Sequence, residues 1–414
     1  MKHSHSKPTG DAVTTIIFLW ESAFTERDAT RMGISTLLSR GFRVEVWNLS
    51  AVLHGNAAPV LPPAAGTSPR TRMFSERKEV EDAIRTLDRS TVVNCFIGFS
   101  FRTRFIFRAL SRSQARYAVQ SFNALPEVSL GRSGEPGLLA SRLVRHLRAS
   151  GGRRILEILM DSVLRKHYRA WGIRPADILL AGGVAPVPSS PYPVGDTTRI
   201  LWLHALDYDH YLALRDRPFR SEPDMAVFID GYDFHHPDLT RCGEGTYPWE
   251  AAYFSRLRQF FDTLERAWGM RVVIAAHPLA RYERPIELFG ERPVIQGRTA
   301  ELIQQGGLTL LHASTAVNYA VLFRKPVLFL TDENYRSHVL GPYIESMAAK
   351  LHRPLVSLDR PPARERQEVM QVDGRRYQEY QNRYIKKEGS DDHPFWEIFA
   401  DAIEAVEDSP PSGK

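Results

Sequence analysis

The chain has 414 residues, of which 43% are hydrophobic and 25% are charged, and its formal net charge is +6. This is an ordinary globular composition, and the length exceeds that of one typical domain, so we expect two. No run of about 18 apolar residues occurs, which excludes a transmembrane helix of the usual kind. The polar stretch 1–13 lacks the apolar core of a signal peptide, so we expect a disordered tail on a cytoplasmic protein.

Strand patterns alternate with helical patterns through the first half. Strands are predicted at 15–20, 43–47, 92–98, 116–120, 178–181 and 200–203, and helices at 27–40, 75–87 and 102–112. Between them, the Pro- and Gly-rich stretch 55–72 is predicted as a loop. Alternation of this kind is typical of βαβ units with a parallel sheet. We therefore predict an N-terminal Rossmann-like domain over 14–221.

The second half repeats this pattern. It begins with a strand at 225–229 and a long amphipathic helix at 249–268. Later strands end at Gly297 or occupy 272–275, 308–311 and 327–330, and helices begin at Thr299 and Ala316. We predict a second Rossmann-like domain over 222–360, followed by helices in 361–414 that pack on or across the domains. The expected fold class is therefore α/β, with two doubly wound domains facing a central cleft.

Polar residues follow several of these second-half strands directly. In a parallel sheet the ligand crevice lies outside the carboxyl ends of the strands, where helix N-termini offer N–H groups to phosphate. A histidine there can donate a hydrogen bond to a phosphate leaving group. Helix capping and ordinary loop roles are the structural alternatives. The predicted phosphate-binding residues are His277, Pro278, Arg281, Arg298, Thr299, Glu301, Ser314 and Thr315.

Four carboxylates follow predicted strands and are candidate general bases. Asp230 ends the strand at 225–229, Asp207 and Asp209 follow the strand at 200–203, and Glu21 follows the first strand. A carboxylate in a cleft can deprotonate an acceptor hydroxyl, although Asp is also common at strand ends for structural reasons. His204 is a candidate second cleft histidine.

Other chemistries have little support. His235 and His236 with Asp238 lack a third ligand at convincing spacing, and Cys95 and Cys242 suggest neither a metal site nor a disulfide framework. A P-loop, a dinucleotide fingerprint and a GxSxG elbow are all missing. We therefore expect no metal or other cofactor.

The stretch 138–171 is strongly basic, with eight Lys or Arg residues against Glu157 and Asp161. Its apolar residues recur at helical spacing. Such helices can lie on an anionic membrane surface, or can pack on the first domain as a solvated pair. Nucleic acid is not an expected partner, because aromatic interleaving and a known binding module are missing.

Residues 223–332 resemble GT-B-type glycosyltransferases of bacterial surface polysaccharide assembly, through Asp230-Gly231, His277-Pro278 and Ser314-Thr315. Within them, the chain is most similar to the sialyltransferase and Kdo-transferase-like branch, and its first half agrees only at fold level. The resemblance implies that His277, Ser314 and Thr315 bind the phosphate of a nucleotide-activated sugar donor. Asp230 would be the base, but those families carry the base in the first domain, so the other carboxylates stay open.

The implied activity is transfer of a sugar from a nucleotide-activated donor to a hydroxyl of a cell-surface polysaccharide or lipid-linked glycan. A CMP-sugar is the favoured donor, and a UDP-sugar or other NDP-sugar is the second choice. For the basic stretch, packing on the first domain is slightly favoured, and peripheral contact with the inner face of the membrane is the alternative. Three alternatives remain. They are a polyol phosphotransferase that uses a CDP-linked donor, a nucleotide-sugar 2-epimerase, and a non-catalytic glycan-assembly protein of the same fold.

Overall fold

A computed structural model describes residues 13–55, 69–126, 156–157, 159–235, 247–338, 340–360 and 365–405. The chain divides into two compact units. The first unit takes the described residues up to Phe122, those from 156 to His204 and those from Gly389 onward, and the second takes 123–126 and Ala205–Glu388. The chain therefore changes unit before the predicted boundary at 221. The reason is that helix α7 (Asp207–Leu214) packs on the second unit, where Asn318 donates a hydrogen bond to Asp207 at 3.0 Å.

The described part of the first unit contains a parallel sheet of seven strands in the order β3-β2-β1-β4-β5-β6-β7. The strands are β1 (Thr15–Trp20), β2 (Arg43–Asn48), β3 (Arg70–Met73), β4 (Thr91–Cys95), β5 (Arg116–Ser121), β6 (Ile178–Ala181) and β7 (Arg199–Trp202). Strand β3 lies in the stretch that we predicted as a loop. All four of its side chains are exposed at the sheet edge, so it lacks the apolar alternation by which strands are recognised.

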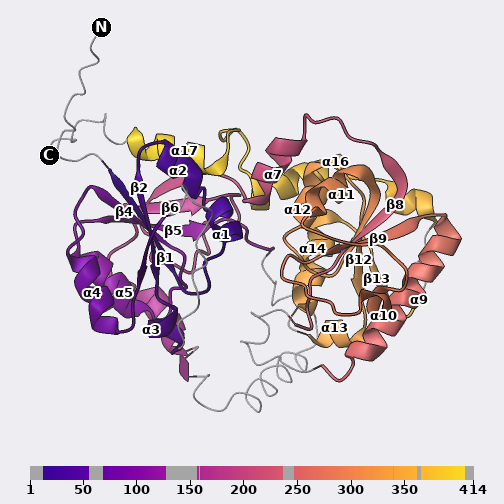
Figure 1. The fold of residues 1–414 in the computed structure, drawn as a ribbon, viewed down its shortest axis with the longest axis horizontal. Helices are drawn as coiled ribbons and strands as arrows, with labels where there is room; N and C mark the ends of the chain where they lie inside the picture. The colour runs from indigo at the N-terminus through magenta and orange to yellow at the C-terminus, as the bar shows by residue number, and fades with distance from the viewer. Residues whose placement is uncertain are drawn as a thin grey trace, which may run out of the picture. The chain divides into compact units, whose positions relative to one another are not determined.

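Helices cover both faces of this sheet (Figure 1). Helices α4 (Arg77–Arg85) and α5 (Arg104–Arg112) lie together on one face, while α2 (Ile34–Ser39) and α17 (Phe395–Glu404) lie together on the other. Successive side chains of β1 point to opposite faces of the sheet. Ile17 joins the core cluster beneath α4 and α5, whereas the ring of Phe18 meets that of Trp396 on α17 at 5.4 Å. A short helix α3 (Ser50–His54) follows β2.

The predicted helix at 27–40 is interrupted. It forms α1 (Glu26–Arg31) and α2, separated at Gly33, which has a left-handed φ of 55°. A Cβ atom on Gly33 would lie 2.3 Å from the Trp396 ring, so only glycine allows α17 to approach this closely. Beyond the break, Arg40 forms ion pairs with Glu397 and Asp401, at 2.9 and 2.6 Å, and a third with Glu404.

The described part of the second unit contains a parallel sheet of six strands in the order β10-β9-β8-β11-β12-β13. They are β8 (Glu222–Ile229), β9 (Arg271–Ala276), β10 (Val294–Gln296), β11 (Gly306–Leu311), β12 (Val327–Thr331) and β13 (Leu355–Ser357). Numbered within each unit, the second sheet follows the order 3-2-1-4-5-6, which is the Rossmann arrangement, and the first sheet adds a seventh strand to the same order. This confirms the predicted fold class of two doubly wound α/β domains, the two-domain architecture of the GT-B class.

Right-handed crossovers place the helices of the second unit on both faces of its sheet. Helices α9 (Glu250–Trp268) and α10 (Pro285–Phe289) cover one face, and α11 (Thr299–Gln305), α12 (Val317–Leu322) and α14 (Gly341–Leu351) cover the other (Figure 1). Helix α13 (Glu333–Ser337) follows β12. Helices α15 (Arg366–Met370) and α16 (Gly374–Tyr380) and the π-helical segment η2 (Gln381–Ile385) lead back towards the first unit. Tyr377 donates a hydrogen bond to the carbonyl of Lys325 at 2.8 Å.

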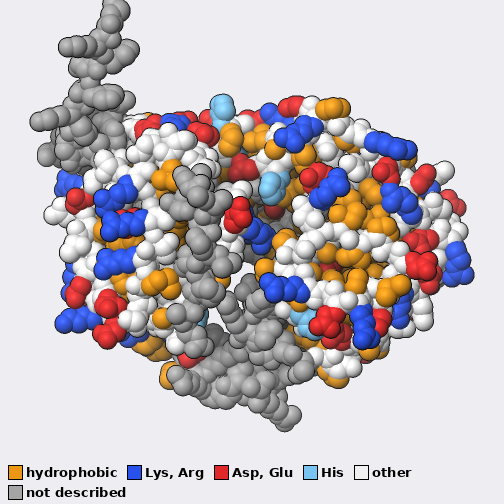
Figure 2. Space-filling view, viewed as in Figure 1, with side chains coloured by type: hydrophobic (Ala, Val, Ile, Leu, Met, Phe, Trp, Pro, Cys, Tyr) orange, Lys and Arg blue, Asp and Glu red, His pale blue; other side chains and the backbone are white. Residues whose placement is uncertain are grey.

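On the visible face, the described residues carry both basic and acidic side chains (Figure 2). Basic and acidic side chains are interspersed there (Figure 2), in keeping with the modest net charge of +6. Within the described ranges, no helix is both long and apolar enough to cross a bilayer.

Candidate functional site

The carboxyl ends of three neighbouring strands bring the candidate site together. Ile229, at the end of β8, pairs with Ala275 on β9 and with Leu311 on β11. The side chains that follow these strands, Asp230, His277 and His312, therefore leave the sheet at the same edge. The strand order reverses between β8 and β11, and ligands of doubly wound sheets bind beside such a reversal.

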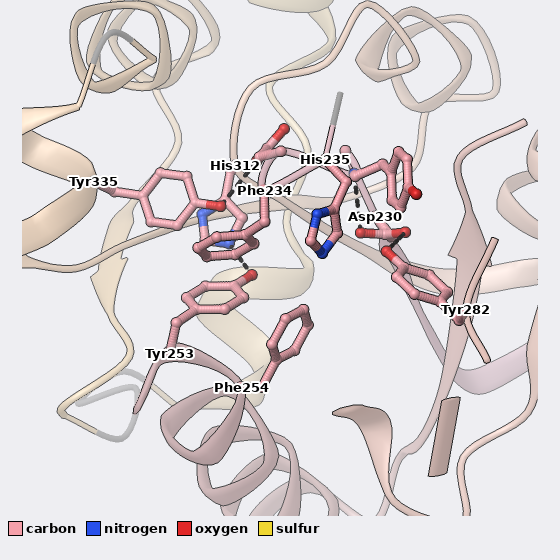
Figure 3. Close-up of a pocket in the computed structure, with 11 residues that line it drawn as sticks. Asp230, Phe234, His235, Tyr253, Phe254, Tyr282, His312 and Tyr335 are labelled. Atoms are coloured by element: carbon pink, nitrogen blue, oxygen red, sulfur yellow. Dashed lines mark hydrogen bonds between the residues drawn. The ribbon is translucent and has the colours of Figure 1, made fainter. Parts of the chain in front are cut away.

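Asp230 is buried, with 8% of its surface exposed. One carboxyl oxygen accepts the hydroxyl of Tyr282 at 2.7 Å, and the other accepts the backbone N–H of Tyr232 at 3.1 Å. The backbone N–H of His277 also bonds this carboxyl. Burial raises the pKa of Asp230, and these hydrogen bonds partly oppose that rise. The carboxyl therefore ties the loop after β8 to the loop after β9 (Figure 3).

The loop that carries His277 is held from two further sides. The Gln296 side-chain nitrogen, at the end of β10, lies 2.9–3.0 Å from the carbonyl oxygens of His277, Pro278 and Ala280. The Nδ1 atom of His277 accepts the backbone N–H of Leu279 at 3.1 Å. A neutral His277 ring must then carry its hydrogen on Nε2, which makes Nε2 a donor. The ring is parallel to that of Tyr232, with centroids 6.4 Å apart.

His312 is a buried, neutral histidine. Its Nδ1 atom lies 2.8 Å from the carbonyl oxygen of Leu330, an acceptor, so Nδ1 carries the hydrogen. Its Nε2 atom then accepts the hydroxyl of Tyr253 on α9 at 2.8 Å (Figure 3). The ring of Tyr335 stacks on the imidazole at 4.0 Å. Burial lowers the pKa of His312 to about 4, so the ring is uncharged at neutral pH.

A second carboxyl, Asp233, lines the same pocket and is half-buried. It accepts the hydroxyl of Tyr335 at 2.9 Å and lies against Gly231, where a Cβ atom would be 2.3 Å from its oxygen. Burial, together with the charge of Asp230, raises the pKa of Asp233 to about 7. Two nearby carboxyls with raised pKa values are unusual outside functional sites.

Asp332, which follows β12, holds two elements that contribute side chains to the pocket. Its side chain is fully buried and forms an ion pair with Arg256 of α9 at 2.6 Å. Its second oxygen caps α13 by accepting the backbone N–H of Tyr335 at 2.7 Å. One buried carboxylate therefore fixes both α9 and the ring that contacts His312 and Asp233.

Ser314 and Thr315 lie in the loop after β11, two and three residues beyond His312. The Ser314 hydroxyl accepts the backbone N–H of Ala316 at 3.2 Å, and the Thr315 carbonyl accepts that of Asn318 at 2.9 Å. The two residues thus form the entry to α12, as predicted, and both are partly exposed. One helical turn beyond Ser314, Asn318 of α12 donates its hydrogen bond to Asp207 of α7.

The other predicted residues are more dispersed. Arg281 and Arg298 are exposed, and Arg298 with Thr299 and Glu301 forms the start of α11 after β10, at the edge of the sheet. Asp209 is in the first turn of α7, beside Asp207. Glu21 belongs to the first unit, where it pairs with His54 at 3.4 Å.

Two further histidines singled out in the sequence, His204 and His235, lie among the described residues. His204 is fully buried and bonds the carbonyl of His393 at 3.0 Å, so it is a core residue and not a second cleft histidine. His235 pairs with Glu250 at 3.0 Å, whereas His236, Asp238 and Cys242 lie outside the described residues. Across the described part of the chain, no group of three or more His, Cys, Asp or Glu is arranged to hold a metal ion.

Several pocket residues had no sequence prediction. His312 offered a usable signal, because it follows an apolar strand just as His277 does. Tyr253, Tyr335 and Arg256 offered none, because an aromatic or basic residue on an amphipathic helix is ordinarily a core or surface residue. The unpredicted residues of the site are Asp233, Tyr253, Arg256, Tyr282, Gln296, His312, Asp332 and Tyr335.

Comparison with known proteins identifies no family. The sequence matches no protein-family model and no curated protein. Among solved structures, the wall teichoic acid polymerase TagF is 11% identical over 95% of this chain and 89% of its own, with a TM-score of 0.45. WaaG, a glycosyltransferase involved in lipopolysaccharide biosynthesis, is 12% identical over 94% and 99%, with a TM-score of 0.41.

The glycotransferase of kitacinnamycin is 12% identical over 96% of this chain and 98% of its own, with a TM-score of 0.41. Identities this low and TM-scores below 0.5 assign neither substrate nor residue roles to this chain. The resemblance to the sialyltransferase and Kdo-transferase-like branch stays a prediction.

Proposed function

We propose that this protein is a glycosyltransferase that moves a sugar from a nucleotide-activated donor to a hydroxyl of a cell-surface polysaccharide or lipid-linked glycan. The second unit would bind the donor, with a CMP-sugar favoured and a UDP- or other NDP-sugar next. The observation that carries the proposal is the convergence of Asp230, His277 and His312 beside the reversal of strand order.

The chemistry of the His277 loop supports a phosphate ligand. The loop is fixed by Gln296 and by the Asp230 carboxyl, and its neutral imidazole carries the hydrogen on Nε2. A preorganised N–H donor stabilises charge that develops on a departing phosphate without having to reorganise during the reaction. Ser314 and Thr315, on the loop after β11, would add hydroxyls, and Arg281 and Arg298 would add positive charge.

The predicted carboxylates are the candidates for the base. Asp230 has both oxygens in hydrogen bonds and is buried, which suits holding the His277 loop better than deprotonating an acceptor. Asp207, Asp209 and Glu21 are each partly exposed. Replacing each of these three with its amide and measuring turnover at saturating donor would identify the base, because only its loss removes an interaction made in the transition state.

Nucleotide binding tests the proposal directly. We expect CMP, or failing that UDP, GDP or dTDP, to raise the melting temperature of the protein, since a ligand bound only by the folded state stabilises it by RT ln(1 + [L]/Kd). At a concentration of about 100 times Kd the gain is about 2.7 kcal/mol. A preference for CDP would favour the polyol phosphotransferase, and donor conversion without an acceptor would favour the epimerase. If none of CMP, CDP, UDP, GDP and dTDP binds, the non-catalytic alternative is favoured.

We further propose peripheral contact with an anionic membrane through the basic stretch. Residues 138–155 lie outside the described residues, but 156–157 and 159–167 are helical. Leu164 inserts into the core, whereas Leu156, Leu159 and Val163 are 59%, 57% and 46% exposed. These three positions fall on one side of a helix, followed by Lys166 and Arg169. An exposed apolar stripe with basic residues suits a lipid surface better than a packed pair.

Sedimentation with lipid vesicles checks this contact. We expect binding to vesicles that contain phosphatidylglycerol, weaker binding in high salt, and little binding to pure phosphatidylcholine. Leu159→Glu should reduce the bound fraction about tenfold, because it removes buried apolar area and adds repulsion. Met73→Glu is the control, since Met73 is an exposed apolar residue of the same unit, at 47%. Equal loss in both variants would contradict the proposed surface.

A further inference from the structure

The loop after β8 carries a carboxyl, Asp233, for which the proposed function has no role yet. Strand β8 lies between β9 and β11 in the sheet. The loop after it therefore leaves the sheet between the strands that carry His277 and Ser314-Thr315. Asp233 is held there by two contacts, a hydrogen bond from Tyr335 and close packing on Gly231. A side chain on Gly231 would displace it.

Among the described residues, the groups that face Asp233 include no cation on an adjacent side chain. The pocket is lined by Asp230 from the same loop, Tyr282 from the loop after β9, Tyr253 from α9, His312 from β11 and Tyr335 from α13, and no Lys or Arg is among its described lining residues. His312 is neutral, His235 pairs with Glu250, and Arg256 pairs with Asp332. Within the described part of the chain, an ionised Asp233 would thus face Asp230 without a compensating cation, which favours the protonated carboxyl.

We propose that Asp233 acts in its protonated form, donating its O–H to the phosphate of the bound donor and passing the proton to that phosphate as the sugar leaves. This rests on the proposed function. An ionised carboxylate would repel a phosphate at this position, whereas a carboxylic acid is a hydrogen-bond donor. Its pKa of about 7 is suited to proton transfer at neutral pH.

Proton transfer from Asp233 accompanies cleavage of the bond between the sugar and the phosphate. The bond between the anomeric carbon and the phosphate oxygen breaks, and its electron pair stays on that oxygen, which takes the proton of Asp233. The acceptor oxygen forms the new bond to the anomeric carbon and loses its own proton to the base. Asp233 is left as a carboxylate and regains a proton from water before the next donor binds.

The pH dependence of nucleotide affinity tests the proposal, with Asp233→Asn as the comparison. Asparagine keeps a hydrogen-bond donor but cannot ionise. Between pH 6 and pH 8 the wild-type protein should lose about tenfold in affinity for CMP relative to the variant, because ionisation through a pKa near 7 removes the donor. The phosphate of CMP titrates equally in both measurements, so the ratio of the two affinities reports on Asp233 alone.

A ratio that is constant from pH 6 to pH 8 would overturn the inference while leaving the proposed function in place. If the wild-type protein binds none of CMP, CDP, UDP, GDP and dTDP at either pH, the proposed function fails and the inference fails with it. Turnover adds a second criterion. Asp233→Asn should keep its affinity for CMP at pH 6 but lose kcat, whereas a purely structural residue would change both or neither.

Thermal unfolding gives a test that needs no ligand. The folded protein holds the Asp233 proton up to about pH 7, whereas an unfolded aspartate releases it near its ordinary pKa. Wild-type stability should therefore fall as pH rises from 4 through 7 on account of this group. Asp233→Asn should melt several degrees above the wild type at pH 8 and show no such gain at pH 4. Equal differences at the two pH values would show that Asp233 is not protonated.

Discussion

Replacement of His277 with alanine should lower nucleotide affinity at least about tenfold and turnover about a hundredfold, while the melting temperature without ligand stays near that of the wild type. A hydrogen bond to a charged group contributes about 1.5–3 kcal/mol, and loss of one donor to a developing oxyanion costs about 10²–10³ in kcat. The fold should survive because Gln296 and Asp230 hold the loop through backbone groups of residues 277, 278 and 280. Calorimetric titration and steady-state kinetics measure the two effects.

Two further variants make the His277 result specific. His277→Asn keeps an oxygen that can accept the backbone N–H of Leu279, as Nδ1 does now. It should preserve the loop and still lose binding, which would separate the ring from the loop conformation. His393→Ala removes an exposed histidine of the first unit that pairs with Asp391, and it should change neither affinity nor turnover. Wild-type binding and turnover in His277→Ala would refute the site assignment.

Replacement of Asp332 with alanine should destabilise the protein by about 3 kcal/mol or more. Breaking a buried ion pair by removing one partner typically costs about 3–5 kcal/mol, and loss of a helix cap adds to this. We take the lower end because the Arg256 side chain is 27% exposed, so water can partly solvate the guanidinium that is left. The melting temperature should fall by about 6–12 °C for a domain of this size. Thermal unfolding without ligand measures it.

Asp359, the second carboxylate that pairs with Arg256, is the control for Asp332. Asp359 lies 3.6 Å from Arg256, but its side chain is 47% exposed, and exposed pairs contribute about 0–1 kcal/mol. Asp359→Ala should therefore melt close to the wild type. Asp332→Asn should fall between the two, because the amide oxygen can still accept the N–H of Tyr335 and cap α13. Similar losses for Asp332→Ala and Asp359→Ala would contradict the structural role assigned to Asp332.

The sequence was sufficient for the doubly wound architecture and for the place of three site loops. Buried parallel strands are continuous apolar runs, so strands such as β9 and β11 could be located from composition alone. A polar residue directly after such a run must lie at the carboxyl edge of the sheet. That argument places Asp230, His277 and Ser314 at this edge.

Residues whose position depends on long-range packing could not be predicted in the same way. The break at Gly33 reflects contact with Trp396, which lies near the other end of the chain. Strand β3 is an exposed edge strand held by pairing with β2 rather than by apolar alternation. The division of the chain after His204 arises because α7 packs on α12, which no local pattern reports.

The composition of the pocket was decided by the tertiary structure alone. Strand ends fix where Asp230 and His312 leave the sheet, but α9 brings Tyr253 and Arg256, and α13 brings Tyr335. Their burial removes water from around Asp230 and Asp233, and this raises both pKa values. Local sequence determines the backbone position of a carboxyl group, whereas its protonation state depends on the side chains that pack around it from distant parts of the chain.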